Sequence, residues 1–137
     1  MTNLEKLVIA SLPDDSFDFL SRLRRLRYLR VVHLPNIKNI EPLKSLIGLT
    51  SLSLATSPSW DRANKTLELD SLRPLLGLTA LRHVELFGVR PADGSLKVLE
   101  SVKSLETARF SQYEQDEMDR FFQVMEVKMA FNPNSSF

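Results

Sequence analysis

The segment Ile40–Leu54, IEPLKSLIGLTSLSL, places an apolar residue at every third position and then closes on the alternating triplet Leu52-Ser53-Leu54. The same six-position apolar ladder occurs four times, and its copies end at Val31, Leu54, Leu86 and Phe110. Only 43% of the chain is hydrophobic, yet every position of the four ladders is apolar, so composition alone does not explain the pattern. An internal repeat of this kind predicts stacked units that share one continuous core.

Each unit contains two apolar periods. The steps of three suit one face of a helical or 3₁₀ segment, whereas the closing alternation has the period of a strand. An earlier, partial copy is present at Leu4, Leu7 and Ile9. Successive units are 22–24 residues long except the third, which is 32 residues long. One short strand and one helical return per unit is the arrangement that these spacings predict.

The segments Leu49-Thr50-Ser51-Leu52-Ser53-Leu54 and Leu81-Arg82-His83-Val84-Glu85-Leu86 resemble the LxxLxL core of leucine-rich repeats. The unit length resembles the short bacterial, internalin-like subclass, and the resemblance covers Leu4 to about Tyr113. It implies an α/β leucine-rich-repeat solenoid, a short curved array with parallel strands on its concave face and helical or 3₁₀ returns on its convex face. We therefore expect a single leucine-rich-repeat domain over residues 1–137, with about five repeats.

One departure from the family pattern concerns the turn that leaves each strand. The family usually places an asparagine three residues after the L-x-L, where it hydrogen-bonds neighbouring backbone. Here those positions hold Leu12, Leu34, Ser57, Val89 and Tyr113. We expect these turns to be held in another way, with prolines at positions 13, 35 and 58 stiffening three of them.

The two ends of the repeat array differ from its middle. Residues 114–125 contain no Gly or Pro and carry Met118, Phe121, Phe122 and Met125 at helical spacing, which predicts an amphipathic helix. We interpret residues 114–131 as a degenerate unit that caps the core, and a partner-binding helix as the less favoured alternative. The first unit begins at its strand, so its edge is expected to pair with another chain, to be covered by a further segment, or to stand alone.

The extra length of the third unit falls within residues 55–70, which we expect to form a loop on one face of the array. Trp60, the only tryptophan, lies in this insertion. It either folds back over the edge of the core or is presented as an anchor for a partner. Local packing is slightly favoured over presentation.

Residues between the ladder positions of each strand point to the opposite face of the sheet, where they form three columns. The first column is Lys6, Tyr28, Ser51, His83 and Thr107; the second is Val8, Arg30, Ser53, Glu85 and Arg109; the third is Ala10, Val32, Ala55, Phe87 and Ser111. Aromatic and arginine side chains among small residues are typical of a protein interface. The candidate binding residues are Tyr28, Arg30, His83, Glu85, Phe87 and Arg109, with Trp60 as a rim contact. The alternative is a solvated face with routine cross-strand charge pairs.

Composition and motifs argue against several functional classes. The 18 basic and 17 acidic residues leave a net charge of +1, which gives no bulk attraction to nucleic acid or to anionic membranes. The basic stretch over residues 21–30 is interpreted as a solvated face. No cysteine is present, and we recognise no signal peptide and no apolar run long enough for a membrane span. We therefore expect a cytoplasmic protein.

Enzyme chemistry is not expected either. The two histidines, His33 and His83, fall in different units, and no metal-ligand spacing surrounds them, so we expect no metal and no cofactor. Ser53, His83 and Glu85 lie on adjacent expected strands, but no nucleophile elbow accompanies them. The hypothesis is a protein-interaction module that binds an unidentified protein through its concave strand face. The alternatives are assembly through the first strand, or a small bacterial immunity- or chaperone-like recognition protein.

Overall fold

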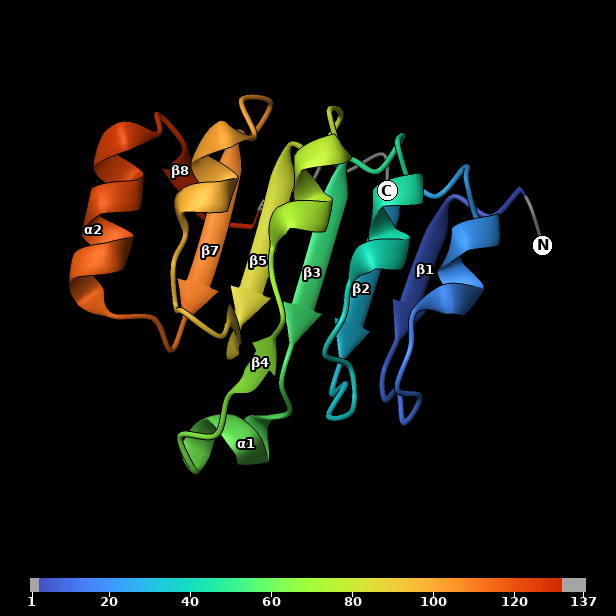
Figure 1. Ribbon diagram of the computed structural model, residues 1–137, viewed down its shortest axis with the longest axis horizontal. Coiled ribbons are helices and arrows are strands. Elements are labelled where there is room, and N and C mark those ends of the chain that lie inside the picture. Colours follow the sequence, from blue (N-terminus) through green and yellow to red (C-terminus); the bar gives the residue numbers. More distant parts are fainter. Residues whose placement is uncertain (1–2, 132–137) are drawn as a thin grey trace.

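The computed structural model describes residues 3–131, and its centre is a six-stranded parallel sheet (Figure 1). The strand order is β1-β2-β3-β5-β7-β8, so the sheet grows in the order of the chain. The strands are β1 (Lys6–Ile9), β2 (Tyr28–Val32), β3 (Ser51–Ala55), β5 (His83–Phe87), β7 (Thr107–Ser111) and β8 (Lys128–Met129). The first five coincide with the alternating ends of the apolar ladders, as expected.

The returns between these strands lie in one layer in front of the sheet in Figure 1. Four of them contain 3₁₀ helices, namely η1 (Asp18–Arg22), η2 (Glu41–Ser45), η3 (Arg73–Gly77) and η4 (Lys97–Ser101). The 3₁₀ form follows from the apolar spacing, because a helix with three residues per turn aligns side chains at i and i+3 on one side. Successive bonds such as Leu43 N to Ile40 O, 2.9 Å, and Leu46 N to Leu43 O, 3.0 Å, follow the same steps.

The core lies between the sheet and the returns. Every ladder residue is buried except Leu23, which is half-buried. At roughly 1.5–3 kcal/mol for each fully buried aliphatic side chain, this layer supplies much of the driving force for folding. A parallel sheet with 3₁₀ returns is an α/β arrangement, and it is consistent with a leucine-rich-repeat-like fold.

The turns that leave the strands are held without an asparagine ladder. Four of the positions in question, Leu12, Leu34, Val89 and Tyr113, carry side chains that are buried in the core. The hydroxyl of Tyr113 donates a 2.7 Å hydrogen bond to the Val89 carbonyl, so one side-chain bond to a neighbouring turn is retained in a new form. At the fifth position, Ser57 caps a helix by accepting a hydrogen bond from Trp60 N.

The insertion at residues 55–70 is more ordered than the expected loop. It contains helix α1 (Pro58–Arg62) and strand β4 (Leu67–Leu69), which pairs in parallel with β6 (Val89–Pro91) in a second, two-stranded sheet. Leu67 and Leu69 are buried, which anchors the insertion to the core. Figure 1 shows α1 projecting beyond the carboxyl ends of β3 and β5.

The last unit adds helix α2 (Gln115–Val124) and strand β8. The expected apolar stripe faces the core, since Phe121 and Met125 are buried and Phe122 is half-buried against them. Arg120 bridges Glu100 of η4 and Glu117 of its own helix at 2.6 Å each, which ties α2 to the preceding unit.

At the other end of the sheet, β1 pairs with β2 alone among residues 3–131. Leu7 and Ile9 are only half-buried there, and Val8 is 53% exposed. The outer edge of β1 therefore exposes backbone groups that pair with no other strand of residues 3–131, beside the exposed side chain of Val8.

Candidate functional site

The face of the sheet that lies away from the returns, called the strand face below, carries the three expected columns in register, except that Ala10 of the third column lies beyond the end of β1. Lys6 aligns with Tyr28, Tyr28 with Ser51, Ser51 with His83 and His83 with Thr107, and the second column aligns in the same way from Val8 to Arg109. The register confirms that side chains widely separated in the sequence share one surface. The three columns nevertheless have different environments.

The first column is covered. We expected Tyr28 and His83 to be open anchors for a partner. That expectation is wrong, because Tyr28 is only 9% exposed and His83 only 7% exposed. The ring of Phe131, from the segment after β8, lies 6.3 Å from the ring of Tyr28 on β2. The chain leaving the last strand therefore reaches across the strand face, and Figure 1 shows it turning behind the sheet.

His83 has a structural environment. Its Nδ1 lies 2.8 Å from the Thr107 hydroxyl of the neighbouring strand. Burial lowers the pKa of His83 below its usual value; nearby Arg82 acts in the same direction and Glu106 opposes them. The imidazole is thus favoured in its neutral form and engaged with Thr107.

The second column is organised around a buried carboxylate. Glu85 is 5% exposed, and its two oxygens accept from the Ser53 hydroxyl at 2.6 Å and from Arg109 Nη1 at 3.2 Å. Arg109 in turn lies 4.8 Å above the ring of Phe87 in a cation–π contact. Since Ser53 bonds Glu85 while His83 bonds Thr107, the three residues do not form a serine–histidine–carboxylate relay.

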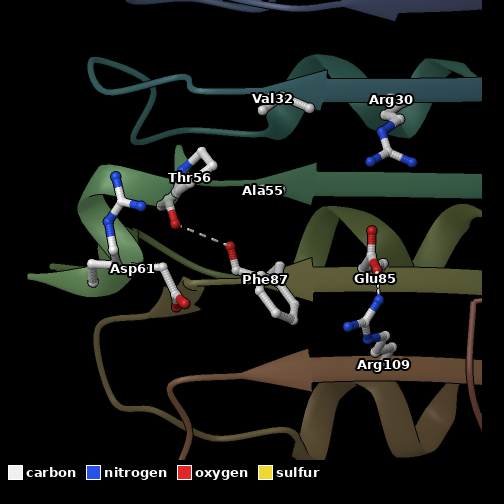
Figure 2. A pocket seen from close by; sticks show the side chains of 10 residues that line it. Arg30, Val32, Ala55, Thr56, Asp61, Glu85, Phe87 and Arg109 are labelled. Carbon is white, nitrogen blue, oxygen red and sulfur yellow. Dashed lines mark hydrogen bonds and ion pairs between the residues drawn. The ribbon is translucent and has the colours of Figure 1, made fainter. Parts of the chain in front are cut away.

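A cavity of about 350 Å³ opens where the second and third columns meet the insertion (Figure 2). The sheet contributes its floor, and α1 closes one side beyond the carboxyl ends of the strands. The lining residues are Arg30, Val32, Ala55, Thr56, Pro58, Asp61, Arg62, Glu85, Phe87 and Arg109.

The wall made by the insertion is fixed by contacts at both of its ends. Asp61 accepts a 3.0 Å hydrogen bond from Gln112 Nε2, which belongs to the turn after β7. That turn has a left-handed backbone at Gln112, with φ of 66°. A second constraint is Gly88, whose φ of 72° brings it against the side chain of Thr56. These two contacts join the wall to the turns that follow β7 and β5.

The charges of the cavity are unevenly satisfied. Glu85 has its partners in Ser53 and Arg109, as described above. By contrast, the side chains of Arg30 and Arg62 make no hydrogen bond and no ion pair with any residue in the range 3–131. The cavity therefore holds two guanidinium groups that are available to a ligand.

Trp60 does not line the cavity. Its ring packs against the edge of the core in a T-shaped contact with His33, 6.0 Å between centroids, and Lys65 Nζ lies 5.7 Å from the ring centroid. Of the two interpretations drawn from the sequence, this geometry corresponds to local packing. Trp60 belongs to α1 and packs this helix against the core, next in sequence to Asp61 and Arg62.

Of the expected binding residues, Arg30, Glu85, Phe87 and Arg109 are brought together at the cavity, whereas Tyr28, His83 and Trp60 are not. Sequence reasoning missed Asp61 and Arg62. The unusual length of the third unit indicated their segment, but within it only Trp60 was chosen as a candidate binding residue. Their position depends on α1, which no periodicity in this short stretch predicts.

No cluster of three or more histidine, aspartate or glutamate side chains within residues 3–131 is arranged to hold a metal ion. Among the same residues, no helix has the length and apolar character needed to cross a bilayer.

No protein-family model matches the chain, and no curated protein matches it. Among solved structures, an internalin (inlF) of Listeria monocytogenes is similar over 92% of this chain and 54% of its own, with 16% sequence identity and a TM-score of 0.34. This chain thus spans about half the length of that internalin.

Proposed function

We propose that this chain is an internalin-like leucine-rich-repeat solenoid that binds a protein partner through the concave strand face. The single observation that carries the proposal is the cavity in which Arg30, Phe87 and Arg109 of the strands meet Asp61 and Arg62 of the insertion. Arginine and aromatic side chains, half-exposed around a small apolar floor, are the groups that protein interfaces use as anchors. No catalytic step is proposed.

The rigidity of this surface supports a binding role. Arg109 is fixed between Glu85 and the ring of Phe87, and the wall residue Asp61 is fixed by Gln112. Because these side chains lose little freedom on association, the entropic cost of binding is reduced. A merely solvated face would not need a buried carboxylate to position its arginine.

The experiment is a quantitative capture comparison with tagged protein. The double variant Arg30→Glu with Phe87→Ala removes one cation and one aromatic anchor from the cavity. The control variant, Lys44→Glu with Ile47→Ala, changes the same residue classes on the opposite face, where both side chains are exposed. Thermal melts establish that both variants remain folded.

We expect one partner, identified by mass spectrometry, to be retained by the wild type and the control and lost by the double variant. Truncating a central interface anchor commonly costs 2 kcal/mol or more, which is at least about thirtyfold in affinity. Equal capture by all three proteins would show that the strand face is not the binding surface.

A second candidate rests on the outer edge of β1, where Leu7 and Ile9 are half-buried and Val8 is exposed. Such an edge is a template for pairing with a strand of another chain. This candidate predicts self-association that depends on concentration and weakens in Val8→Lys. Light scattering that gives a monomer at every practical concentration would exclude it.

A further inference from the structure

We propose that the cavity selects an acidic segment of the partner, in which an apolar side chain lies between two carboxylates. This inference rests on the proposed function and names the chemistry of the segment that the strand face would recognise. It follows from the charge, the floor and the direction of the cavity.

The charge argument starts from the two available guanidinium groups. The cavity lining contains three arginines and two carboxylates, so its net charge is positive. Glu85 is occupied by Ser53 and Arg109, and it is too deeply buried to receive a cation from a partner. Arg30 and Arg62 are left to attract carboxylates, for which the guanidinium fork is well matched.

The floor between these two arginines is apolar. In Figure 2, Val32, Ala55 and Phe87 lie between Arg30 and the helix that carries Asp61 and Arg62. Phe87 is half-buried and presents its ring to the cavity beneath Arg109. An apolar side chain of the ligand would be desolvated there while its neighbours meet the arginines at either side.

The spacing along the sheet suits an extended segment. Arg30 and Val32 stand two residues apart on β2, roughly 6.7 Å along the strand, and α1 follows beyond the strand end. In an extended peptide, side chains at i, i+2 and i+4 share one side with the same repeat. The matching sequence is therefore acidic–x–apolar–x–acidic.

The test uses a capped peptide, acetyl-Glu-Ser-Phe-Ser-Glu-amide, titrated into the ¹⁵N-labelled full chain and followed by NMR. Two matched peptides replace both glutamates by glutamine or by lysine. For so short a ligand we expect a Kd of about 1 mM at low salt. The shifted resonances should be confined to the carboxyl ends of β2, β3 and β5 and to α1.

Protein variants assign the two carboxylate positions. Arg30→Gln and Arg62→Gln should each weaken binding of the acidic peptide about two- to fivefold, the range of a partly exposed ion pair. Arg30→Lys should retain most of the affinity. Lys44→Gln, a cation on the opposite face, should leave it unchanged, and raising the salt should weaken it in the wild type.

Three results would overturn the inference. Equal binding of the glutamine peptide would show that only the apolar floor is recognised. Stronger binding of the lysine peptide would show that Asp61 and Glu85 govern the selection. The absence of cavity-localised shifts with up to about 10 mM acidic peptide would show that the segment does not fit, since even weak fragments bind in that range.

Failure here is distinguishable from failure of the proposed function. If the acidic peptide fails while Arg30→Glu with Phe87→Ala still loses the captured partner, the strand face binds a segment of other chemistry. If the double variant still captures the partner, the proposed function is wrong, irrespective of the result with the peptide.

Discussion

Glu85 is the residue around which the strand face is arranged. A carboxylate that is 5% exposed must have its oxygens satisfied, and Ser53 and Arg109 do this. The consequence lies in Arg109, whose half-exposed guanidinium pairs with Glu85 and lies above the ring of Phe87. A buried acid thus gives the surface a fixed cation and a fixed ring.

Gly88 tests how the insertion is attached. Its positive φ and its closeness to Thr56, whose Oγ1 would lie 2.3 Å from an added Cβ, leave no room for a side chain. We expect Gly88→Ala to lower the free energy of unfolding by about 1–3 kcal/mol. Urea denaturation measures this change.

Gly77→Ala is the matched control, because an added Cβ there meets nothing within 4 Å and the backbone φ is not positive. Its effect should stay within about 0.5 kcal/mol of zero. If the two substitutions had equal effects, the close approach of Gly88 to Thr56 would not constrain the fold.

His83 predicts a dependence of stability on pH. Because burial lowers its pKa in the folded state, the unfolded chain binds the proton more readily as the pH falls below 6.5. The free energy of unfolding should therefore decrease as the pH falls from 6.5 towards the lower, folded-state pKa of His83, and this contribution should level off below that value.

Denaturation curves between about pH 8 and pH 5 check this prediction. His83→Gln keeps a polar group beside Thr107 but cannot take up a proton, so its stability should vary less over the same range. An identical slope in both proteins would assign the pH dependence to other groups.

At the scale of elements, the apolar ladders predict most of the fold because each strand and each return repeats the same burial. The ladder ends mark β1, β2, β3, β5 and β7, and the spacing of three accounts for the 3₁₀ geometry of the returns. The insertion could not be predicted in the same way. Strand β4 forms because Leu67 and Leu69 pair with residues of β6. That pairing depends on the turn after β5, which places β6 beside β4.

For the candidate site, the strand residues are predictable from the sequence, whereas the contributions of the tail and of α1 are not. Arg30, Glu85, Phe87 and Arg109 share a face because side chains alternate along strands, which the sequence reveals. Tyr28 is contacted by Phe131, about a hundred residues further along the chain, and no local pattern could have predicted that contact. Arg62 reaches the cavity only through the placement of α1.

Arg120 tests the attachment of the last helix. Its guanidinium lowers the pKa of Glu117 and also bonds Glu100, so Arg120→Gln leaves two nearby carboxylates without their shared cation. We expect the free energy of unfolding to fall by about 1 kcal/mol at neutral pH. The loss should shrink as the pH falls below 4.5, where Glu117 becomes protonated first in the unfolded chain and then, at its lower pKa, in the folded one.

Lys44→Gln serves as the control, because the Lys44–Glu41 pair is exposed and joins residues of a single return. Its effect should be close to zero. If hydrogen exchange in α2 were equal in both variants, the Arg120 bridge would not hold the helix to η4.

At the scale of the whole molecule, the sheet, the returns and the insertion have different structural roles. The returns and the core provide a rigid support, and the strands arrange Arg30, Glu85 and Arg109 in one row. The insertion then adds a wall at the carboxyl ends of the central strands. The cavity therefore lies where the regular repeat is interrupted.

The most direct test is a hydrogen–deuterium exchange footprint of the purified partner on this chain. Binding through the strand face predicts slower exchange at the ends of β2, β3 and β5 and in α1, with no change in η2 or η3. Protection confined to the 3₁₀ returns, or to the outer edge of β1, would contradict binding through the strand face.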